Sequence, residues 1–465
     1  MIEKYYSGVI EQIYNRIGKE TRNIVMANYS NDFSIENLEV IRRYQSNEDN
    51  VFFAYSEFSY NTLVGAYEPF LDIICNMHRR FIGGSFDDFQ KECGVYYLHR
   101  QVLNSYYETG ECFREETVLL NEVAYEQRRM TMAIADMLKK LSEVKPLMIV
   151  INRFQMASKS SIETIKYLID NPCANIGIVL GVNAIVKGTD STVEVWDRIV
   201  ESLEDRSAIY YIGSAGPLKN NVKTTNDDEL YITMNFEQSI QEASNIMEFL
   251  DFEQARRGCR IIEHKLKFED AWIDEKSLRR FYMVYARTSV LLGEMSKAIE
   301  LMNEYKALIP ENDSEHYLSL YYFMKGTCYM YQGKLEKAGN SAKSAYDYAV
   351  LAEDDTLIFK AELLSVMIKM SGWYNIFFCV QDIPVSDEII EKLIKHGYRN
   401  HLAHIYIYAY DNSRDVVKQS FYDESLLKHF TKGLELAKEI GNEQLVYDAY
   451  QKTIMLASTS GLNEI

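Results

Sequence analysis

Three histidines and one cysteine–histidine pair are the residues whose types and spacing could support metal binding or nucleophilic chemistry. His396, His401 and His404 lie close together, and the last two, three residues apart, would share a helix face that could bind a metal. Because tyrosines flank them and no cysteine lies between them, the sequence favours helix packing. Cys93 and His99 could form a thiol nucleophile and its base, but the sequence offers no third group to orient the histidine. We therefore predict no metal site, no catalytic residue and no enzymatic activity.

Nucleotide binding is the second chemistry to test, because a polar loop follows a short apolar run at residues 23–27. A phosphate-binding loop needs Gly-x-x-x-x-Gly-Lys-Ser/Thr after a strand, so that backbone N–H groups and the lysine surround the phosphates. The positions of the two glycines and the lysine fall on Asn28, Phe33 and Ser34, and the next lysine along the chain is Lys91. The sequence therefore predicts that this loop binds no nucleotide cofactor.

The elements that would position functional groups differ between the two halves of the chain. In the first half, continuous apolar runs alternate with helical stretches, which is typical of a parallel sheet covered by helices on both faces. We expect an α/β domain over residues 1–220, a polar linker over 221–234 and a helical domain over 235–465. The expected strands are residues 23–27, 51–54, 147–151, 176–181 and 209–212, and a long helix is expected over 115–143.

The second half is predicted to contain only helices, and two of its segments repeat with the same spacing. Gly293 is followed five residues later by Ala298, and Gly333 by Ala338. A glycine suits the turn between two antiparallel helices, and small residues allow the helices to approach closely. A unit that recurs after about 40 residues and buries its faces by stacking predicts an α-helical solenoid. Gly372 would mark a further turn.

This helical half resembles the tetratricopeptide repeat family, in a form with about 40 residues per unit, through the glycine and alanine spacing just described. Repeat proteins of this kind hold peptides in a concave groove. The spacing places Tyr322 and Tyr329 in the packed core. It does not place Tyr321 and Tyr331, so these two tyrosines are the candidates for contact with a partner.

The first half resembles the signal-transducing ATPases with numerous domains, a family that includes LuxR-type regulators, in the segment after the third expected strand. Phe154 and Ser161 fit framework positions of that family. Asn152 and Arg153 stand where the family has two aspartates, which in such ATPases orient magnesium and the attacking water. The resemblance implies a P-loop-like fold, and the departures imply a degenerate site without nucleotide chemistry.

Composition and charge limit the partners of this 465-residue chain. Lys and Arg number 50 against 68 Asp and Glu, and the net charge of −18 repels nucleic-acid phosphates and anionic lipid. We find neither a signal region nor a run of about 18 apolar residues that could span a membrane. Seven dispersed cysteines without a Cys-x-x-Cys pair are typical of reduced thiols. We expect a cytoplasmic protein that does not bind nucleic acid directly.

These observations favour a non-catalytic regulatory or scaffold protein that binds a protein partner or a small ligand through its helical repeats. The alternative is a LuxR-type transcriptional regulator, or a derivative without its own DNA-binding domain, controlled by nucleotide or an inducer. The resemblance supports this alternative. The net charge opposes it, as does the short stretch after Ser458, which has no room for a helix-turn-helix.

Overall fold

The chain forms two compact units in the computed structural model. Unit 1 comprises Met1–Val95, His99–Phe113 and Glu126–Trp272, and unit 2 comprises Tyr96–Leu98, Arg114–Tyr125 and Ile273–Ile465. The structure describes residues 2–29, 35–36, 38–46, 50–59, 63–120, 122–183, 193–205, 208–212, 235–268, 273–312, 314–374, 387–409 and 424–460. The linker predicted over 221–234 lies outside these residues.

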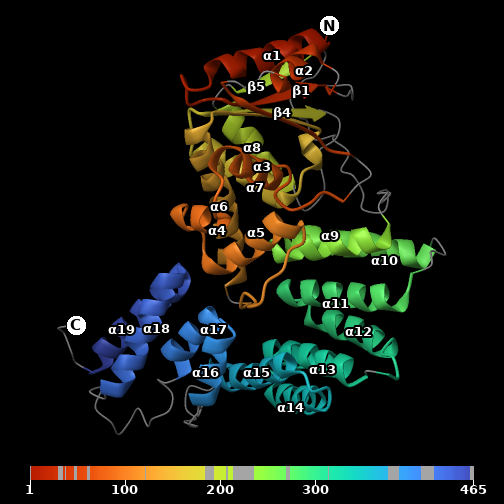
Figure 1. Cartoon of the computed structure of the whole chain (residues 1–465), viewed down its shortest axis with the longest axis vertical. Coiled ribbons are helices and arrows are strands. Elements are labelled where there is room, and N and C mark those ends of the chain that lie inside the picture. Colours follow the sequence, from red (N-terminus) through yellow and green to blue (C-terminus); the bar gives the residue numbers. More distant parts are fainter. Residues whose placement is uncertain are drawn as a thin grey trace. The chain divides into compact units, whose positions relative to one another are not determined.

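Unit 1 contains a five-stranded parallel sheet with the strand order β2-β3-β4-β1-β5 (Figure 1). Its strands are β1 (Ile24–Tyr29), β2 (Phe52–Glu57), β3 (Leu147–Asn152), β4 (Ile176–Asn183) and β5 (Ile209–Ile212). Each strand coincides with one of the five predicted apolar runs, which confirms the parallel α/β sheet. Every residue of β3 and β4 is buried, because helices cover both faces of the sheet.

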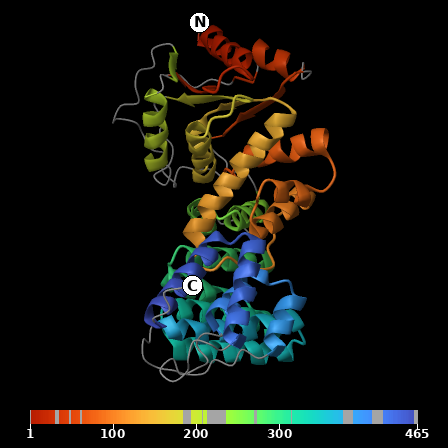
Figure 2. The same ribbon diagram turned by 90° about the vertical axis from the view of Figure 1, so that its left-hand side faces the viewer.

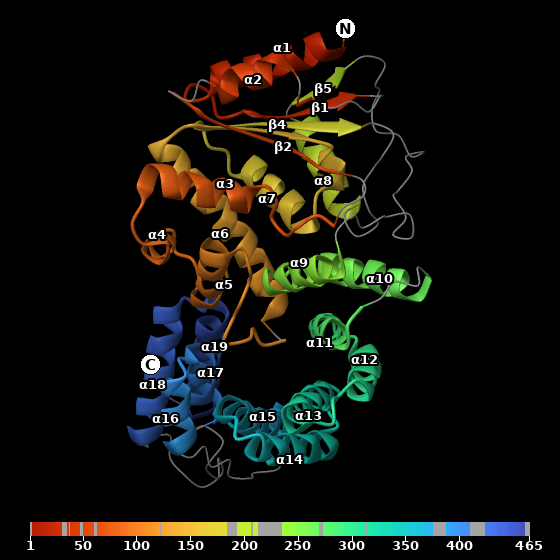
Figure 3. The ribbon, with the colours of Figure 1, turned by 45° about the vertical axis from the view of Figure 1, so that its right-hand side comes forward.

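Helices lie on the two faces of this sheet (Figures 2 and 3). On one face are α1 (Ile2–Arg16) and α2 (Glu39–Gln45), and on the other are α3 (Phe70–Met77), α6 (Val123–Val144), α7 (Lys159–Asp170) and α8 (Val193–Glu204). Tyr6 and Ile10 of α1 pack on Val25 and Val150 in the core. Because β1 lies between β4 and β5, the chain leaves β1 and β4 in opposite directions along the sheet. Open α/β sheets bind ligands at the carboxyl ends of such strands.

The remaining elements of unit 1 complete its helical covering. They are a π-helical turn (His78–Ile82), α4 (Phe86–Glu92), most of α5 (Tyr97–Thr109), a 3₁₀ turn (Phe154–Met156), α9 (Phe236–Glu248) and α10 (Phe252–Phe268). The prediction of one helix over 115–143 is wrong in its first part, because α6 begins only at Val123. The segment that precedes α6 belongs to unit 2 and has contacts there that no local pattern reveals.

The described part of unit 2 is mostly helical, and its successive helices pack against one another (Figure 3). Its helices are α11 (Glu275–Leu291), α12 (Met295–Ala307), α13 (Ser314–Tyr331), α14 (Leu335–Leu351), α15 (Asp355–Tyr374), α16 (Asp387–Lys395), α17 (Arg399–His404) with a π-helical turn after it (Ile405–Ala409), α18 (Glu424–Ile440) and α19 (Glu443–Ser460). Among the described residues, no helix has the length and apolar character that crossing a membrane requires.

The predicted glycine positions in the first two helix pairs are confirmed. Gly293 and Gly333 have φ angles of 79° and 70°, in the left-handed region that glycine adopts readily, and each lies in the turn between paired helices. At Gly326 on α13, a Cβ would lie 2.9 Å from Cδ2 of Leu364, so a larger residue there would force this side chain of α15 to shift. The further turn predicted at Gly372 is wrong, because this residue lies in the last turn of α15.

Candidate functional site

The carboxyl edge of the sheet in unit 1 is the place where a nucleotide site would form. Asn28 and Tyr29 end β1, Asn152 ends β3, and all three side chains are buried. The hydroxyl of Tyr29 donates a hydrogen bond of 2.7 Å to Oδ1 of Asn152, so the tyrosine spans β4, which separates the two strands. Side chains of the protein itself therefore fill this edge. Phe33 and Ser34, the other two loop positions of the sequence prediction, lie outside the described residues.

Gly181 on β4 makes room for this packing. A Cβ at this position would clash with Oη of Tyr6 and lie 2.8 Å from Oδ1 of Asn152. Tyr6 comes from α1 and is fully buried, with its ring edge-to-face to that of Tyr29 at 6.4 Å between centroids. Burial raises the pKa of Tyr6 well above the ordinary value for tyrosine, and Tyr29 contributes to the increase, so the phenol is neutral. Among the described residues, neutral aromatic and amide groups therefore occupy the part of the edge between β1, β3 and α1.

Arg153 supplies a positive charge at the same edge, but this charge is paired within unit 1. Its Nη1 atom lies 2.9 Å from Oε1 of Glu57, the last residue of β2. Arg153 has a φ of 54°, which is uncommon for a residue other than glycine and turns the chain sharply after β3. Next to it, the backbone N–H of Asn183 at the end of β4 donates to Oε1 of Gln155 at 3.3 Å. Arg153 and Gln155 thus each have a partner from a neighbouring strand at this edge.

Substitution of Gly181 by alanine tests whether the edge is as tightly filled as the distances indicate. We expect this variant to lower the free energy of unfolding of unit 1 by about 1–3 kcal/mol, since overpacking a close-packed core costs this much. Adding Tyr6→Phe removes the clashing hydroxyl and should recover part of the loss in urea unfolding curves. Gly8→Ala in α1, where a Cβ meets no atom within 4 Å, is the control and should be neutral or stabilising. Equal stability of the Gly181→Ala and Gly8→Ala variants would contradict the prediction.

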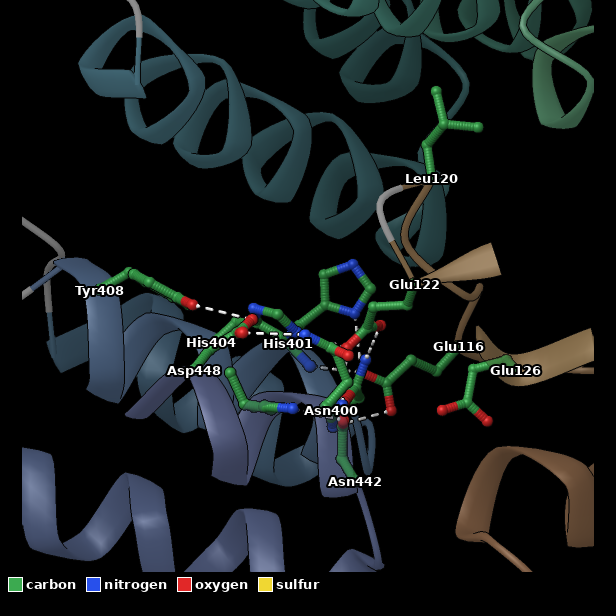
Figure 4. A network of polar contacts seen from close by, with 12 residues as sticks. Glu116, Leu120, Glu122, Glu126, Asn400, His401, His404, Tyr408, Asn442 and Asp448 are labelled. Carbon is green, nitrogen blue, oxygen red and sulfur yellow. Dashed lines mark hydrogen bonds and ion pairs between the residues drawn. The ribbon is translucent and has the colours of Figure 1, made fainter. Parts of the chain in front are cut away.

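A second buried polar cluster lies in unit 2, where residues 114–125, here called the strap, meet α17 and the turn between α18 and α19 (Figure 4). The carboxylate of Glu116 accepts hydrogen bonds from the backbone N–H groups of Asn400 (3.1 Å) and His401 (2.6 Å). The same carboxylate lies 2.7 Å from Nδ1 of His401. Nε2 of His404 lies 2.9 Å from Oε1 of Glu122. Each histidine of this pair thus has a carboxylate partner from the strap.

Glu122 is the most strongly perturbed carboxyl group of this cluster. Its oxygens accept hydrogen bonds from Nδ2 of Asn442 (2.6 Å) and Nδ2 of Asn400 (3.0 Å). Burial alone would raise the pKa of Glu122, but the positive charge of His404 and the hydrogen bonds outweigh it and lower the pKa to about 2. Nδ2 of Asn442 also donates a hydrogen bond of 2.7 Å to Oδ1 of Asn400. This bond links α17 to the turn between α18 and α19, the two places that contact the strap. The Glu122 carboxylate is therefore ionised, and side chains of unit 2 form its hydrogen bonds.

Two of the three histidines that the sequence singled out, His401 and His404, therefore lie together, but with partners that the sequence did not reveal. His401 and His404 do share a side of α17, whereas His396 stacks on the ring of Phe359 at 4.4 Å between centroids. Among the described residues, no group of three or more metal-binding side chains could hold a metal ion. Glu116 and Glu122 were missed. The visible signal was the apolar run 118–120 before α6, which has glutamates on both sides.

Cys93 and His99, the other pair considered from the sequence, have different environments in unit 1. Burial raises the pKa of the Cys93 thiol to about 12, so the thiol stays protonated near neutral pH. Nε2 of His99 lies 2.8 Å from Oε2 of Glu126, and both side chains are fully buried. A protonated thiol is a poor nucleophile, because the thiolate is the reactive form.

The two tyrosines proposed for partner contact differ in exposure. Tyr321 is 3% exposed, and its hydroxyl donates to Oδ1 of Asn303 (3.2 Å) and accepts from Nζ of Lys325 (3.0 Å). Tyr331 is 36% exposed, and its hydroxyl accepts a long hydrogen bond of 3.4 Å from the backbone N–H of Leu120 in the strap. Of the two, Tyr331 has the more accessible side chain.

A comparison with models of protein families finds no match for this chain, and a comparison with curated proteins also finds none.

Proposed function

We propose that this protein is a non-catalytic regulatory or scaffold protein that binds a protein partner or a small ligand through its helical unit. In this proposal the α/β unit has lost nucleotide chemistry and serves as a structural or docking unit. The observation that carries the proposal is the filled carboxyl edge, where Tyr29 spans from β1 to Asn152 across β4. A phosphate group would have to displace a buried tyrosine to reach the place where open α/β sheets bind ligands.

The charges at this edge also argue against a triphosphate. Tight phosphate binding needs cationic side chains or free backbone N–H groups, and magnesium needs carboxylates. Asn152 has an amide at the position where a carboxylate could bind magnesium, and the positive charge of Arg153 is paired with Glu57. These features agree with the interpretation of 1–220 as a degenerate P-loop ATPase-like domain. The parallel sheet and the long helix α7 after β3 are compatible with that family.

Partner binding through the helical unit is supported by its construction from packed helix pairs. The turn glycines Gly293 and Gly333 and the close packing at Gly326 follow the tetratricopeptide-like pattern. Helical repeats of this kind commonly use the surfaces between their helices to hold extended segments of other proteins. The proposal assigns the binding role to this unit.

Isothermal titration with ATP and ADP in the presence of Mg²⁺ tests the loss of nucleotide chemistry. We expect no saturable heat up to millimolar nucleotide for the full chain. The Tyr29→Ala variant should also give none, because it opens space without adding a cation or a carboxylate. Micromolar binding that disappears when residues 28–35 are changed would contradict the proposal.

A transcriptional regulator controlled by nucleotide or an inducer is the second candidate. It is favoured by Phe154 and Ser161, whose positions match the LuxR-type framework: Phe154 is fully buried, and Oγ of Ser161 donates to the carbonyl of Glu68 at 2.8 Å. A gel-shift assay at low salt separates the two candidates. Sequence-independent or specific retardation of duplex DNA by the purified chain would favour the regulator.

A further inference from the structure

The strap, residues 114–125, has the arrangement of a peptide bound to unit 2. In sequence it lies between two stretches of unit 1, but its contacts assign it to unit 2. Its last three residues, from Val123, are helical, and residues 114–120 and 122 are neither helix nor strand. Such a segment has few hydrogen bonds of its own, so its position depends on the groups of unit 2 that contact it.

The strap contacts unit 2 through its backbone, and apolar side chains of the strap are buried. The carbonyl of Glu115 accepts a hydrogen bond of 2.7 Å from the hydroxyl of Tyr398, and the N–H of Leu120 donates to Tyr331. Between these two points, Val118 and Leu119 are 6% and 8% exposed. From Arg114 to Val118, buried and exposed residues alternate along the strap. Backbone hydrogen bonds combined with buried alternate side chains are how proteins bind extended peptides.

Two carboxylates fix the strap at its ends (Figure 4). Glu116 is held by two backbone N–H groups and the His401 ring, and six residues later Glu122 is held by His404, Asn400 and Asn442. Hydrogen bonds to ionised carboxylates are about twice as strong as those between neutral groups. The surface thus selects two carboxylates at a fixed spacing, with an apolar stretch between them.

The residues that contact the strap form one surface, which we call the strap-binding surface and which consists of Tyr331, Tyr398, Asn400, His401, His404 and Asn442. We propose that the strap is an internal ligand of this surface, and that a partner protein binds here by displacing it. The partner would supply an extended segment with two carboxylates six residues apart that flank an apolar stretch. This inference rests on the proposed partner-binding function and names the site and the chemistry of the partner.

Because the strap is part of the same chain, a partner segment must compete with it for the strap-binding surface. A tethered ligand acts at an effective concentration that reaches millimolar for short linkers, so a free peptide with the same contacts binds only weakly while the strap is in place. Weakening the two carboxylate anchors of the strap should therefore increase the apparent affinity for a free peptide. The strap-binding surface itself is unchanged by such a substitution.

The experiment uses the full chain and a fluorescein-labelled peptide with the sequence of residues 114–125. Fluorescence anisotropy should show at least tenfold tighter binding to the Glu116→Gln/Glu122→Gln variant than to the wild type. The same peptide with both glutamates changed to glutamine should bind the variant at least tenfold more weakly. The matched control is Glu111→Gln/Glu311→Gln, which removes two exposed carboxylates outside the strap and should bind the peptide as the wild type does.

A folded variant, judged by circular dichroism, that does not bind the peptide would overturn the proposal. Equal binding of the glutamate and glutamine peptides would overturn it as well. If the variant does not fold, hydrogen exchange of the strap amides in the wild type tests displacement instead. Strap amides that exchange by local opening, at a lower free energy than those of α13, support displacement, whereas exchange only together with α13 excludes it.

The nucleotide titration separates this inference from the proposed function. Peptide binding in a protein that also binds ATP would contradict the loss of nucleotide chemistry and leave the strap-binding surface supported. Absence of both peptide and ATP binding would contradict the inference alone.

Discussion

Replacing Asp251 with alanine is expected to lower the free energy of unfolding of unit 1 by about 3 kcal/mol. Asp251 is buried, and its Oδ2 atom accepts a hydrogen bond of 3.0 Å from the N–H of Ser160 in the first turn of α7. Its Oδ1 atom accepts one of 3.4 Å from the N–H of Gln254 in α10. One carboxylate therefore caps two helices. Loss of one cap costs about 1 kcal/mol, and buried N–H groups left without acceptors cost about 1–3 kcal/mol more.

The matched control for this substitution is Asp274→Ala in unit 2. Asp274 caps only α11, through a 3.0 Å hydrogen bond from the N–H of Ser277, and it is not buried. We expect this control to cost about 1 kcal/mol. Because two units need not unfold in one step, hydrogen exchange of α7 and α10 should be measured beside urea unfolding. Equal losses of the free energy of unfolding in the Asp251→Ala and Asp274→Ala variants would show that Asp251 does not stabilise both α7 and α10.

The parallel sheet could be predicted because its strands carry the information locally. The runs at 147–151 and 176–181 are continuously apolar, and only a strand covered on both faces needs such a pattern. The structure places them at Leu147–Asn152 and Ile176–Asn183, each extended by one or two residues. Each strand ends in an asparagine, Asn152 or Asn183, which a pattern of apolar residues does not include. The prediction also stopped one apolar residue short, at Val182.

The state of the candidate nucleotide site could be predicted only in part. The absence of a lysine and glycines at Asn28, Phe33 and Ser34 is visible in the sequence. The filling of the edge is not, because it depends on a contact between Tyr29 and Asn152, which lie 123 positions apart. Likewise, Gly181 of β4 has a packing role only because the side chain of Tyr6, from α1, lies against it.

The strap could not be predicted, because long-range contacts decide its conformation. Residues 115–122 continue the helical composition of α6, so the sequence predicted one helix. The structure starts the helix at Val123, since Glu116 and Glu122 are bound by His401 and His404, 285 and 282 positions away. The spacing of the two histidines was sufficient to predict a shared helix face. It could not show which groups face them.

Replacing Glu122 with alanine is expected to lower the free energy of unfolding of unit 2 by about 3–5 kcal/mol, because it removes the acceptor of several buried donors and each buried group left without a partner costs about 1–3 kcal/mol. The substitution leaves His404, Asn400 and Asn442 without their acceptor. The matched control is Glu362→Ala, which breaks a half-buried ion pair with Lys392 and should cost less than about 1 kcal/mol. Similar losses in the two variants, in urea unfolding at pH 7, would contradict a special role of Glu122.

The pH dependence of the Glu122→Ala effect gives a second test with a defined sign. The pKa of Glu122 is lowered from the ordinary value of 4.5 to about 2 in the folded protein, so folding favours the ionised carboxylate. Its contribution to stability is complete above pH 4.5 and is lost as the pH falls from 4.5 toward 2. The stability difference between wild type and variant should therefore be constant between pH 7 and 5 and decrease below 4.5. A difference that stays unchanged down to pH 3 would show that Glu122 is not held as an ionised group by His404 and the two asparagines.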